Sequence, residues 1–200
     1  MAAAHGSEPH CAPLASLRVA DGYRNLSMLI SGYKLAQRTK GRRNRPLRSV
    51  QEHAEGLVCI TGGDEGPLAS ALERGGMEEG RKILTQLVQA FGPKNVYVEL
   101  QRHGICEQEP RNQAAVSLAR EFHLPLLATK GVSMAVEFER EILDVLTSIR
   151  HGCSLDEAGL LLQQNGKRHL RSAAEMFALF GDVPEAIAAT GELSERLTSR

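Results

Sequence analysis

Residues 96–109 read VYVELQRHGICEQE, and their first half decides the fold. Apolar residues alternate with polar ones, which predicts a β-strand with one polar face. That face carries Tyr97, Glu99, Gln101 and His103. A glutamate and a histidine at the carboxyl end of a strand either hold a metal ion or form a polar rim without chemistry. The rest of the chain bears on that choice.

Short apolar runs and helical patterns alternate on both sides of this strand. LVCI at residues 57–60 and LPLLAT at residues 124–129 predict two more buried strands. Helices are predicted between the strands, and the first helical stretch breaks at the Gly75-Gly76 pair. Strand, helix, strand, helix, strand is the order of parallel β/α units, so the predicted fold class is α/β.

Three regions are expected along the chain. Residues 1–21 show no periodicity and are interpreted as a flexible tail, residues 22–136 carry the β/α pattern, and residues 137–200 are all helical. In the last region, Ser154 and Ser172 each begin an S-x-x-E capping-box pattern. Its first helix has one apolar face, formed by Phe138, Ile142, Val145, Leu146 and Ile149.

The composition excludes several classes of partner. The 200 residues include 24 lysines and arginines and 24 aspartates and glutamates, so no net charge attracts nucleic acid or an anionic membrane. No run reaches the roughly 18 apolar residues of a membrane span, and the amino terminus lacks a signal-peptide pattern. Four scattered cysteines without a CxxC pair favour reduced thiols. A cytoplasmic protein with no membrane contact is therefore expected.

One local run of charge departs from this balance. RTKGRRNRPLR at residues 38–48 carries six basic residues and no acidic one. It contains no aromatic residue to stack on a base, so any DNA contact would be weak, salt-dependent and independent of sequence. The candidate contact residues are Lys40, Arg42, Arg43, Arg45 and Arg48. The alternative is a solvated loop that offsets acidic stretches elsewhere.

Several strings in fixed order between residues 22 and 198 carry a family resemblance. They are HAEGLVCITGG, GPLASALERGG, FGPKNVYVELQRHG, LPLLATKGV, REILDVLTSIR and HLRSAAEMFALFGDVPEAI. The chain resembles the bacterial error-prone DNA polymerase, a C-family enzyme related to the DNA polymerase III alpha subunit. The matching region is the later part of its amino-terminal PHP (polymerase and histidinol phosphatase) domain and the helical segment that follows.

This resemblance implies a fold and two kinds of metal chemistry. The fold is a PHP-type (β/α) barrel with parallel strands, here partial, followed by an all-helical extension toward the polymerase core. Active PHP domains bind Zn²⁺ or Mn²⁺ among histidines and carboxylates, and the family's polymerase reaction uses Mg²⁺ held by palm-domain aspartates. Neither the HxH pair of the first barrel strand nor the palm is recognised here. The chain is thus expected to begin after those strands, to stop before the palm, and to bind no cofactor itself.

The resemblance also bears on His103 and on ATKGVS at residues 128–133. His103 matches a family metal ligand, whereas Ser133 stands where the family has a histidine. Lys130 and Gly131 replace the polar and acidic family positions, and a lysine cation repels a metal ion. Because too few ligands remain, His103 is interpreted as a vestigial ligand at the rim of a former pocket. No catalytic residue is expected.

Three functions compete at this point. The favoured one is a non-catalytic fragment of an error-prone DNA polymerase, which performs DNA-templated nucleotidyl transfer in damage-tolerant synthesis and repair. Its partner would be the remaining polymerase polypeptide. The second is a degenerate metal-dependent phosphoesterase, in which His103 needs two or more further ligands from Glu99, His53 and His123. The third is a sequence-independent DNA-binding module that uses residues 38–48.

Overall fold

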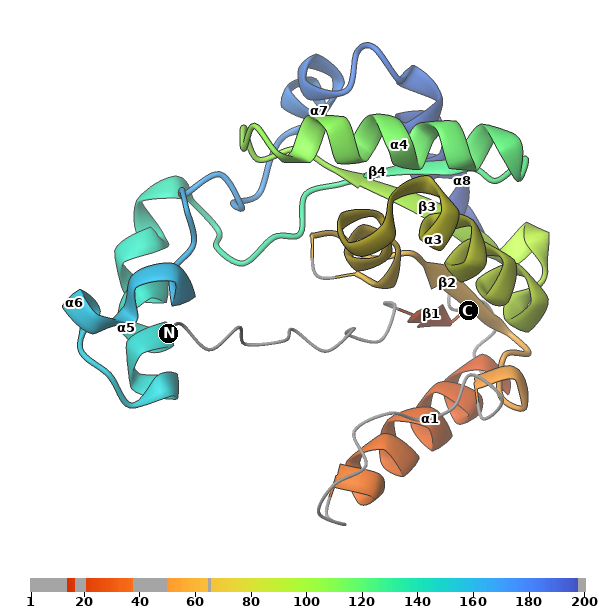
Figure 1. Ribbon diagram of the computed structural model, residues 1–200, viewed down its shortest axis with the longest axis horizontal. Coiled ribbons are helices and arrows are strands. Elements are labelled where there is room, and N and C mark those ends of the chain that lie inside the picture. Colours follow the sequence, from red (N-terminus) through yellow and green to blue (C-terminus); the bar gives the residue numbers. More distant parts are fainter. Residues whose placement is uncertain (1–13, 17–20, 38–49, 65, 198–200) are drawn as a thin grey trace.

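A four-stranded sheet forms the centre of the protein (Figure 1). The computed structural model describes residues 14–16, 21–37, 50–64 and 66–197. The strand order is β1-β2-β3-β4, with bounds β1 (Leu14–Ser16), β2 (Leu57–Ile60), β3 (Val96–Gln101) and β4 (Leu126–Thr129). β2, β3 and β4 are parallel, and β1 pairs antiparallel with β2. The α/β class is confirmed, and the three parallel strands are consistent with a partial PHP-type barrel.

Two helices connect the parallel strands, α3 (Pro67–Phe91) and α4 (Gln108–Glu121). The short helix η1 (Pro93–Asn95) leads from α3 into β3. α3 consists of two helical pieces that meet at Gly75 and Gly76, where φ is −143° and 60°. The break predicted at this pair is confirmed, because a positive φ is accessible to glycine at little cost.

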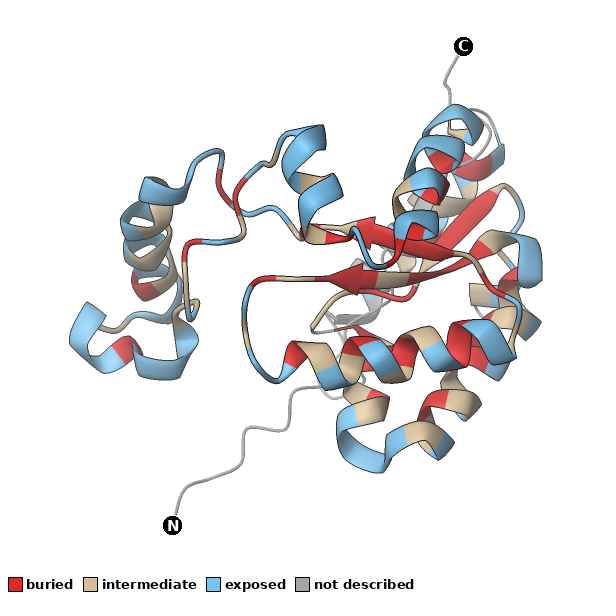
Figure 2. Cartoon of the chain, turned by 90° about the horizontal axis from the view of Figure 1, so that it is seen from above, coloured by how far each residue is buried: buried red, intermediate tan, exposed pale blue. Residues whose placement is uncertain are grey.

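Side-chain alternation along the strands gives the sheet two apolar faces. One face packs against α3 and α4 and includes Cys59, Val98 and Ala128. The other packs against α8 (Pro184–Arg196) and includes Val58, Tyr97 and Leu127. Figure 2 shows the burial concentrated along the strands and the helix surfaces that face them. The parallel strands are thus covered on both sides, as is usual for such sheets.

The region after residue 136 is helical but consists of two parts. Its elements are η2 (Glu137–Glu139), α5 (Arg140–His151), α6 (Leu155–Ala158), η3 (Gly159–Leu161), α7 (Ala173–Leu179) and α8. α5 and α6 stand apart from the sheet, whereas α8 returns to cover it (Figure 1). Thr190 Oγ1 of α8 lies 3.2 Å from the Ala128 carbonyl oxygen, to which it donates. The capping boxes predicted at Ser154 and Ser172 are confirmed.

Residues 14–16 depart from the flexible tail predicted for residues 1–21. They form β1, in which Leu14 lies opposite Cys59, and α1 (Asp21–Gln37) begins at the last residue of that range. The strand was not predicted, because three residues are too short to show a period of two. Pairing with β2 defines the strand there, rather than the local sequence. The other residues of the predicted tail lie outside the described part of the chain.

Within the described part of the chain, no helix has both the length and the apolar character needed to cross a membrane.

Candidate functional site

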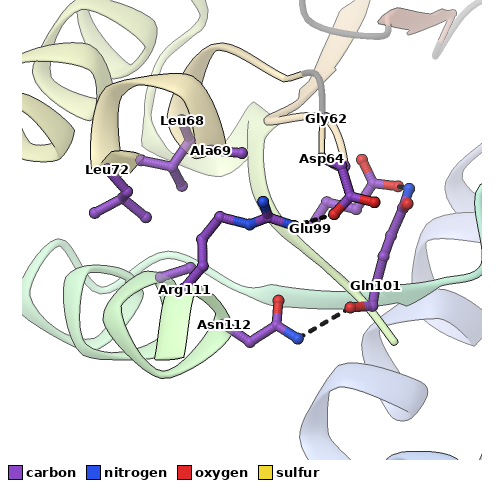
Figure 3. Close-up of a pocket in the computed structure, with 11 residues that line it drawn as sticks. Gly62, Asp64, Leu68, Ala69, Leu72, Glu99, Gln101, Arg111 and Asn112 are labelled. Atoms are coloured by element: carbon purple, nitrogen blue, oxygen red, sulfur yellow. Dashed lines mark hydrogen bonds and ion pairs between the residues drawn. The ribbon is translucent and has the colours of Figure 1, made fainter. Parts of the chain in front are cut away.

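The carboxyl ends of β2, β3 and β4 meet at one edge of the sheet. In open α/β proteins this edge is the usual place of ligand binding. A cleft of about 720 Å³ opens here, lined also by residues 160–165 and Arg168. A smaller pocket beside the cleft, shown in Figure 3, is lined by Asp64, Glu99, Gln101, Arg111 and Asn112 together with apolar residues of α3. The polar residues at this edge make up the candidate site.

Asp64 is the centre of the site and lies in the loop between β2 and α3. Arg111 forms an ion pair with its Oδ1 and Arg168 with its Oδ2. Gln108 Nε2 lies 2.9 Å from each of these oxygens. Burial raises the pKa of Asp64, but its hydrogen bonds with Gln108 and the charges of Arg111 and Arg168 lower it more. The net effect holds the pKa well below its ordinary range, so Asp64 is a carboxylate at neutral pH.

The loop that carries Arg168 is fastened to the chain after β4. The Ser133 backbone N–H donates to the Arg168 carbonyl oxygen at 2.9 Å, and Met134 forms a parallel β-bridge with His169. His169 Nδ1 in turn lies 2.8 Å from the Gly166 carbonyl oxygen. These contacts bring Arg168 to Asp64 across more than one hundred residues of sequence.

His103 is fully buried and lines neither the cleft nor the smaller pocket. Its Nε2 lies 2.8 Å from the Lys130 carbonyl oxygen, which can only accept, so Nε2 carries the proton. Its Nδ1 lies 2.7 Å from Gln108 Nε2 and accepts from it. Both ring nitrogens therefore have protein partners. The next residue, Gly104, has a positive φ of 69°.

Glu99 and Gln101 contact each other at the end of β3. Of the face that the alternation predicted to be polar, Tyr97 is instead buried in the apolar cluster under α8. Gln101 Nε2 donates to Glu99 Oε1 at 2.7 Å, and the Thr129 hydroxyl donates to the same oxygen. The other side-chain oxygens of Glu99 and Gln101 are buried without a partner among the described residues. A Cβ at Gly63 would lie 2.3 Å from the Gln101 side chain, and one at Gly131 would lie 2.7 Å away. The amide of Gln101 thus fits only between two glycines.

Lys130 occupies the position after β4 where the family resemblance led us to expect a polar or acidic residue. Its side chain is buried, and its Nζ donates to the Arg102 carbonyl oxygen. Burial, together with the nearby charges of Arg171, Lys167 and Arg168, lowers its pKa to about 8. The edge therefore holds a lysine close to three other cationic side chains.

Two of the three reserve ligands of the phosphoesterase hypothesis, His53 and His123, do not converge on His103. His53 precedes β2 and His123 precedes β4, so both lie at the amino ends of their strands. His103 and Glu99 lie at the opposite, carboxyl edge. A four-residue strand separates its two ends by roughly 13 Å, far beyond the reach of a shared metal ion. Among the described residues, no three histidine, cysteine, aspartate or glutamate side chains form a group able to hold a metal.

The described residues of this edge therefore do not fit the metal cluster that the resemblance implies. Asp64 has two guanidinium partners, and His103 has both nitrogens engaged. A divalent cation would have to displace the arginines from Asp64 and approach Lys130 against charge repulsion. What the edge does provide is an internal ion-pair network that joins the ends of the three strands.

Sequence reasoning missed Asp64 and its partners. Asp64 lies outside α3, which begins at Pro67 after the capping Gly66. The signal that could have identified Asp64 is its place in the loop after a buried parallel strand, at the edge where such sheets bind ligands. Nothing local marks Arg111 or Arg168 as its partners, since long-range packing brings them together.

The basic loop predicted to contact DNA lies outside the described residues. This covers Lys40, Arg42, Arg43, Arg45 and Arg48, so their role stays a prediction.

Comparisons with known proteins match the chain to one group. The family model described as PHP domain matches residues 5–103. The chain is 37% identical over 189 residues to the error-prone DNA polymerase of Mycolicibacterium paratuberculosis, an alignment that covers 94% of the chain. It is 36% identical over 189 residues to the error-prone DNA polymerase of Mycobacterium tuberculosis, again over 94% of the chain. It is 31% identical over 175 residues to the DNA polymerase III subunit alpha of Vibrio cholerae, over 88% of the chain. The chain spans only 17%, 17% and 15% of the lengths of these relatives.

Proposed function

Because the chain belongs to the bacterial DNA polymerase family of error-prone DNA polymerase and DNA polymerase III subunit alpha, we propose that it is a non-catalytic structural module of an error-prone polymerase. The polymerase would carry out damage-tolerant, DNA-templated nucleotidyl transfer. Its Mg²⁺ and catalytic aspartates would belong to the remaining polymerase polypeptide, which is the proposed partner of this chain.

The relatives support the error-prone branch of the family. Identity reaches 37% with a protein named error-prone DNA polymerase, against 31–35% for three named DNA polymerase III subunit alpha. The aligned segment is a small part of either kind of enzyme, since it covers 17% or less of them. A role as one module of a larger polymerase accounts for both facts.

One observation carries the non-catalytic part of the proposal, the ion-pair network around Asp64. A metal site that performs hydrolysis needs carboxylates or imidazoles free to coordinate, and an open position for water. Here Arg111 and Arg168 pair with the carboxylate, and the ring of His103 is hydrogen-bonded on both sides. The carboxyl edge then serves stability, by fastening the strand ends to α4 and to the loop before α7.

Metal titration and turnover assays test this proposal directly. Isothermal titration calorimetry with Zn²⁺, Mn²⁺ and Mg²⁺ should give no saturable heat at this edge, and the chain alone should neither hydrolyse p-nitrophenyl phosphate nor extend a primer. Stoichiometric metal binding that disappears in Glu99→Gln, together with hydrolysis, would refute it. Glu73→Gln is the matched control, because Glu73 is exposed and lies on the same network without facing the cleft.

A reconstitution experiment tests whether the remaining polymerase polypeptide is the partner of this chain. The chain added to the separately produced remainder of the polymerase should form a stable complex and raise its primer extension across an abasic site. An unchanged rate and no complex would show that the chain is not a module of that enzyme.

We also propose a weak, sequence-independent DNA contact by the loop of residues 38–48, because six basic side chains occur there without an acid. The affinity for single-stranded DNA should fall as salt rises. It should fall further when Arg42, Arg43, Arg45 and Arg48 are replaced by alanine. An affinity that the four substitutions leave unchanged would contradict this role.

A further inference from the structure

Two buried acceptor atoms at the carboxyl edge of the sheet lack a hydrogen-bond partner within the described part of the chain. They are Glu99 Oε2 and Gln101 Oε1, the oxygens that stay unpaired when Gln101 Nε2 donates to Glu99 Oε1. Figure 3 shows the ends of these two side chains beside each other, next to Asp64. A buried acceptor without a donor costs free energy, which a donor recovers on reaching it. The two oxygens therefore point to a ligand that supplies N–H groups.

The large cleft at this edge is lined by both residues that carry the two oxygens. Gly63 and Gly131 also line it. A Cβ on either glycine would lie only 2.3 Å or 2.7 Å from the Gln101 amide, so neither residue places a side chain between that amide and the cleft. Both oxygens are buried, so contact with a ligand requires a small movement of the loops that carry the glycines. A cleft of about 720 Å³ has the size of a small-molecule site.

Arg168, which also lines the cleft, adds a donor beside the two acceptors. Its Nη2 pairs with Asp64, whereas its Nη1 makes no hydrogen bond within the described part of the chain. A Cβ on Gly131 would lie 3.0 Å from Nη1 and 2.7 Å from Gln101 Oε1, so this donor and this acceptor both adjoin the same glycine. A ligand that fits these groups carries N–H donors and an acceptor on neighbouring atoms.

The charges at the site favour a neutral ligand. The charged residues that line the cleft and the smaller pocket are Asp64, Glu99, Arg111 and Arg168, so the two carboxylates are balanced by two guanidinium groups. A primary carboxamide is neutral, its –NH₂ group donates two hydrogen bonds, and its carbonyl oxygen accepts. It therefore meets the requirements that the unpaired groups set.

We propose that the cleft binds a small neutral molecule that carries a primary carboxamide on an apolar body. The carboxamide –NH₂ donates to Glu99 Oε2 and Gln101 Oε1, and its carbonyl oxygen accepts from Arg168 Nη1. Apolar side chains of Ile105 and residues 160–162, which also line the cleft, contact the body of the ligand. This binding involves no catalytic step and does not depend on the polymerase role proposed above.

Three benzene derivatives of similar size test the proposal on the wild-type full chain. Benzamide supplies two N–H donors and a carbonyl, N,N-dimethylbenzamide supplies the carbonyl alone, and benzoate supplies two acceptors and a negative charge. In ¹H–¹⁵N NMR titrations, benzamide should cause saturable shifts of the backbone amide signals of Gly63 and Gly131. The dissociation constants of the other two compounds should be at least about tenfold higher, because neither can donate to the two oxygens.

A substitution of Glu99 tests which atom accepts. Glu99→Gln keeps the shape of the side chain but places a donor –NH₂ at the position of the unpaired Oε2. It should raise the dissociation constant of benzamide by at least about tenfold. Glu78→Gln is the matched control, because Glu78 is 73% exposed on α3 and lines neither pocket, and it should leave benzamide binding unchanged. Thermal unfolding by circular dichroism checks that both variants are folded.

Three outcomes would overturn the proposal. Benzoate that binds as tightly as benzamide would make this an anion site. Benzamide shifts that do not saturate, or that occur away from the two glycines, would place no carboxamide here. A crystal structure grown with saturating benzamide, in which ordered water molecules alone donate to Glu99 Oε2 and Gln101 Oε1, would assign these oxygens to water.

Discussion

Replacing Asp64 by asparagine removes the charge at the centre of the network while keeping the shape of the side chain. The two guanidinium partners are mostly buried, since the Arg111 and Arg168 side chains are 15% and 23% exposed, and Asp64 itself is 21% exposed. A charged hydrogen bond of this kind contributes about 1.5 kcal/mol or more. Loss of two such bonds gives an expected destabilisation of about 3 kcal/mol at neutral pH.

The effect should depend on pH in a definite direction. The folded state lowers the pKa of Asp64, so the unfolded chain takes up a proton at this residue more readily. The stabilisation is therefore complete above the unfolded pKa of about 4 and is lost as pH falls toward the folded value. The difference between wild type and Asp64→Asn should shrink as the pH is lowered from 7 to 3.

Urea unfolding followed by circular dichroism measures both quantities. Glu73→Gln is the matched control, because Glu73 pairs with the same Arg111 but is 57% exposed, and its loss should cost under about 1 kcal/mol. A change below about 0.5 kcal/mol in Asp64→Asn would refute the reasoning, since surface substitutions reach that size. So would a difference that is constant between pH 7 and pH 3.

Four further substitutions test other parts of the fold. Gly131→Ala should lower the free energy of unfolding by about 2 kcal/mol or more, since φ is 51° and the new Cβ would meet the Gln101 side chain. Gly152→Ala has a similar φ but open space, so thermal unfolding should show a smaller loss of about 1 kcal/mol, and equal losses would contradict the clash. Ser172→Ala removes the capping-box hydroxyl of α7 and should cost about 1 kcal/mol in chemical denaturation, whereas no loss would mean that the cap is dispensable. Lys130 has a folded pKa of about 8 against an ordinary 10.5, so between these values the unfolded state binds the extra proton and stability rises with pH. Lys130→Met should lack that rise when unfolding is measured from pH 8 to 10, and an identical rise in the variant would exclude Lys130 as its source.

The sequence predicted the parallel part of the fold because its signals are local. The apolar run at residues 57–60 matches β2, and the alternation that begins at Val96 matches β3. Gly75-Gly76 marked the break in α3, and two S-x-x-E patterns marked helix starts. Each of these features is written within a few neighbouring residues.

The candidate site could be predicted only in part, because its contacts join distant segments. The position of Glu99 and Gln101 on one face of β3 followed from the period of two. Asp64 and Arg168 are 104 residues apart in the sequence, and no local pattern specifies their pairing. The burial of His103 likewise depends on Gln108 and on the backbone of Lys130, which only the folded chain brings together.

The position of α8 has a consequence for synthesis on the ribosome. Val58, Tyr97 and Leu127 acquire their apolar cover from Ala189 and Leu193 of α8, which follow all three parallel strands in the sequence. While the nascent chain is being made, that face of the sheet stays bare until α8 has left the exit tunnel. Bare apolar strands of this kind attract holding chaperones and aggregate when those are scarce. Burial of this face of the sheet thus depends on emergence of α8, and stalling before residue 184 would leave an aggregation-prone intermediate.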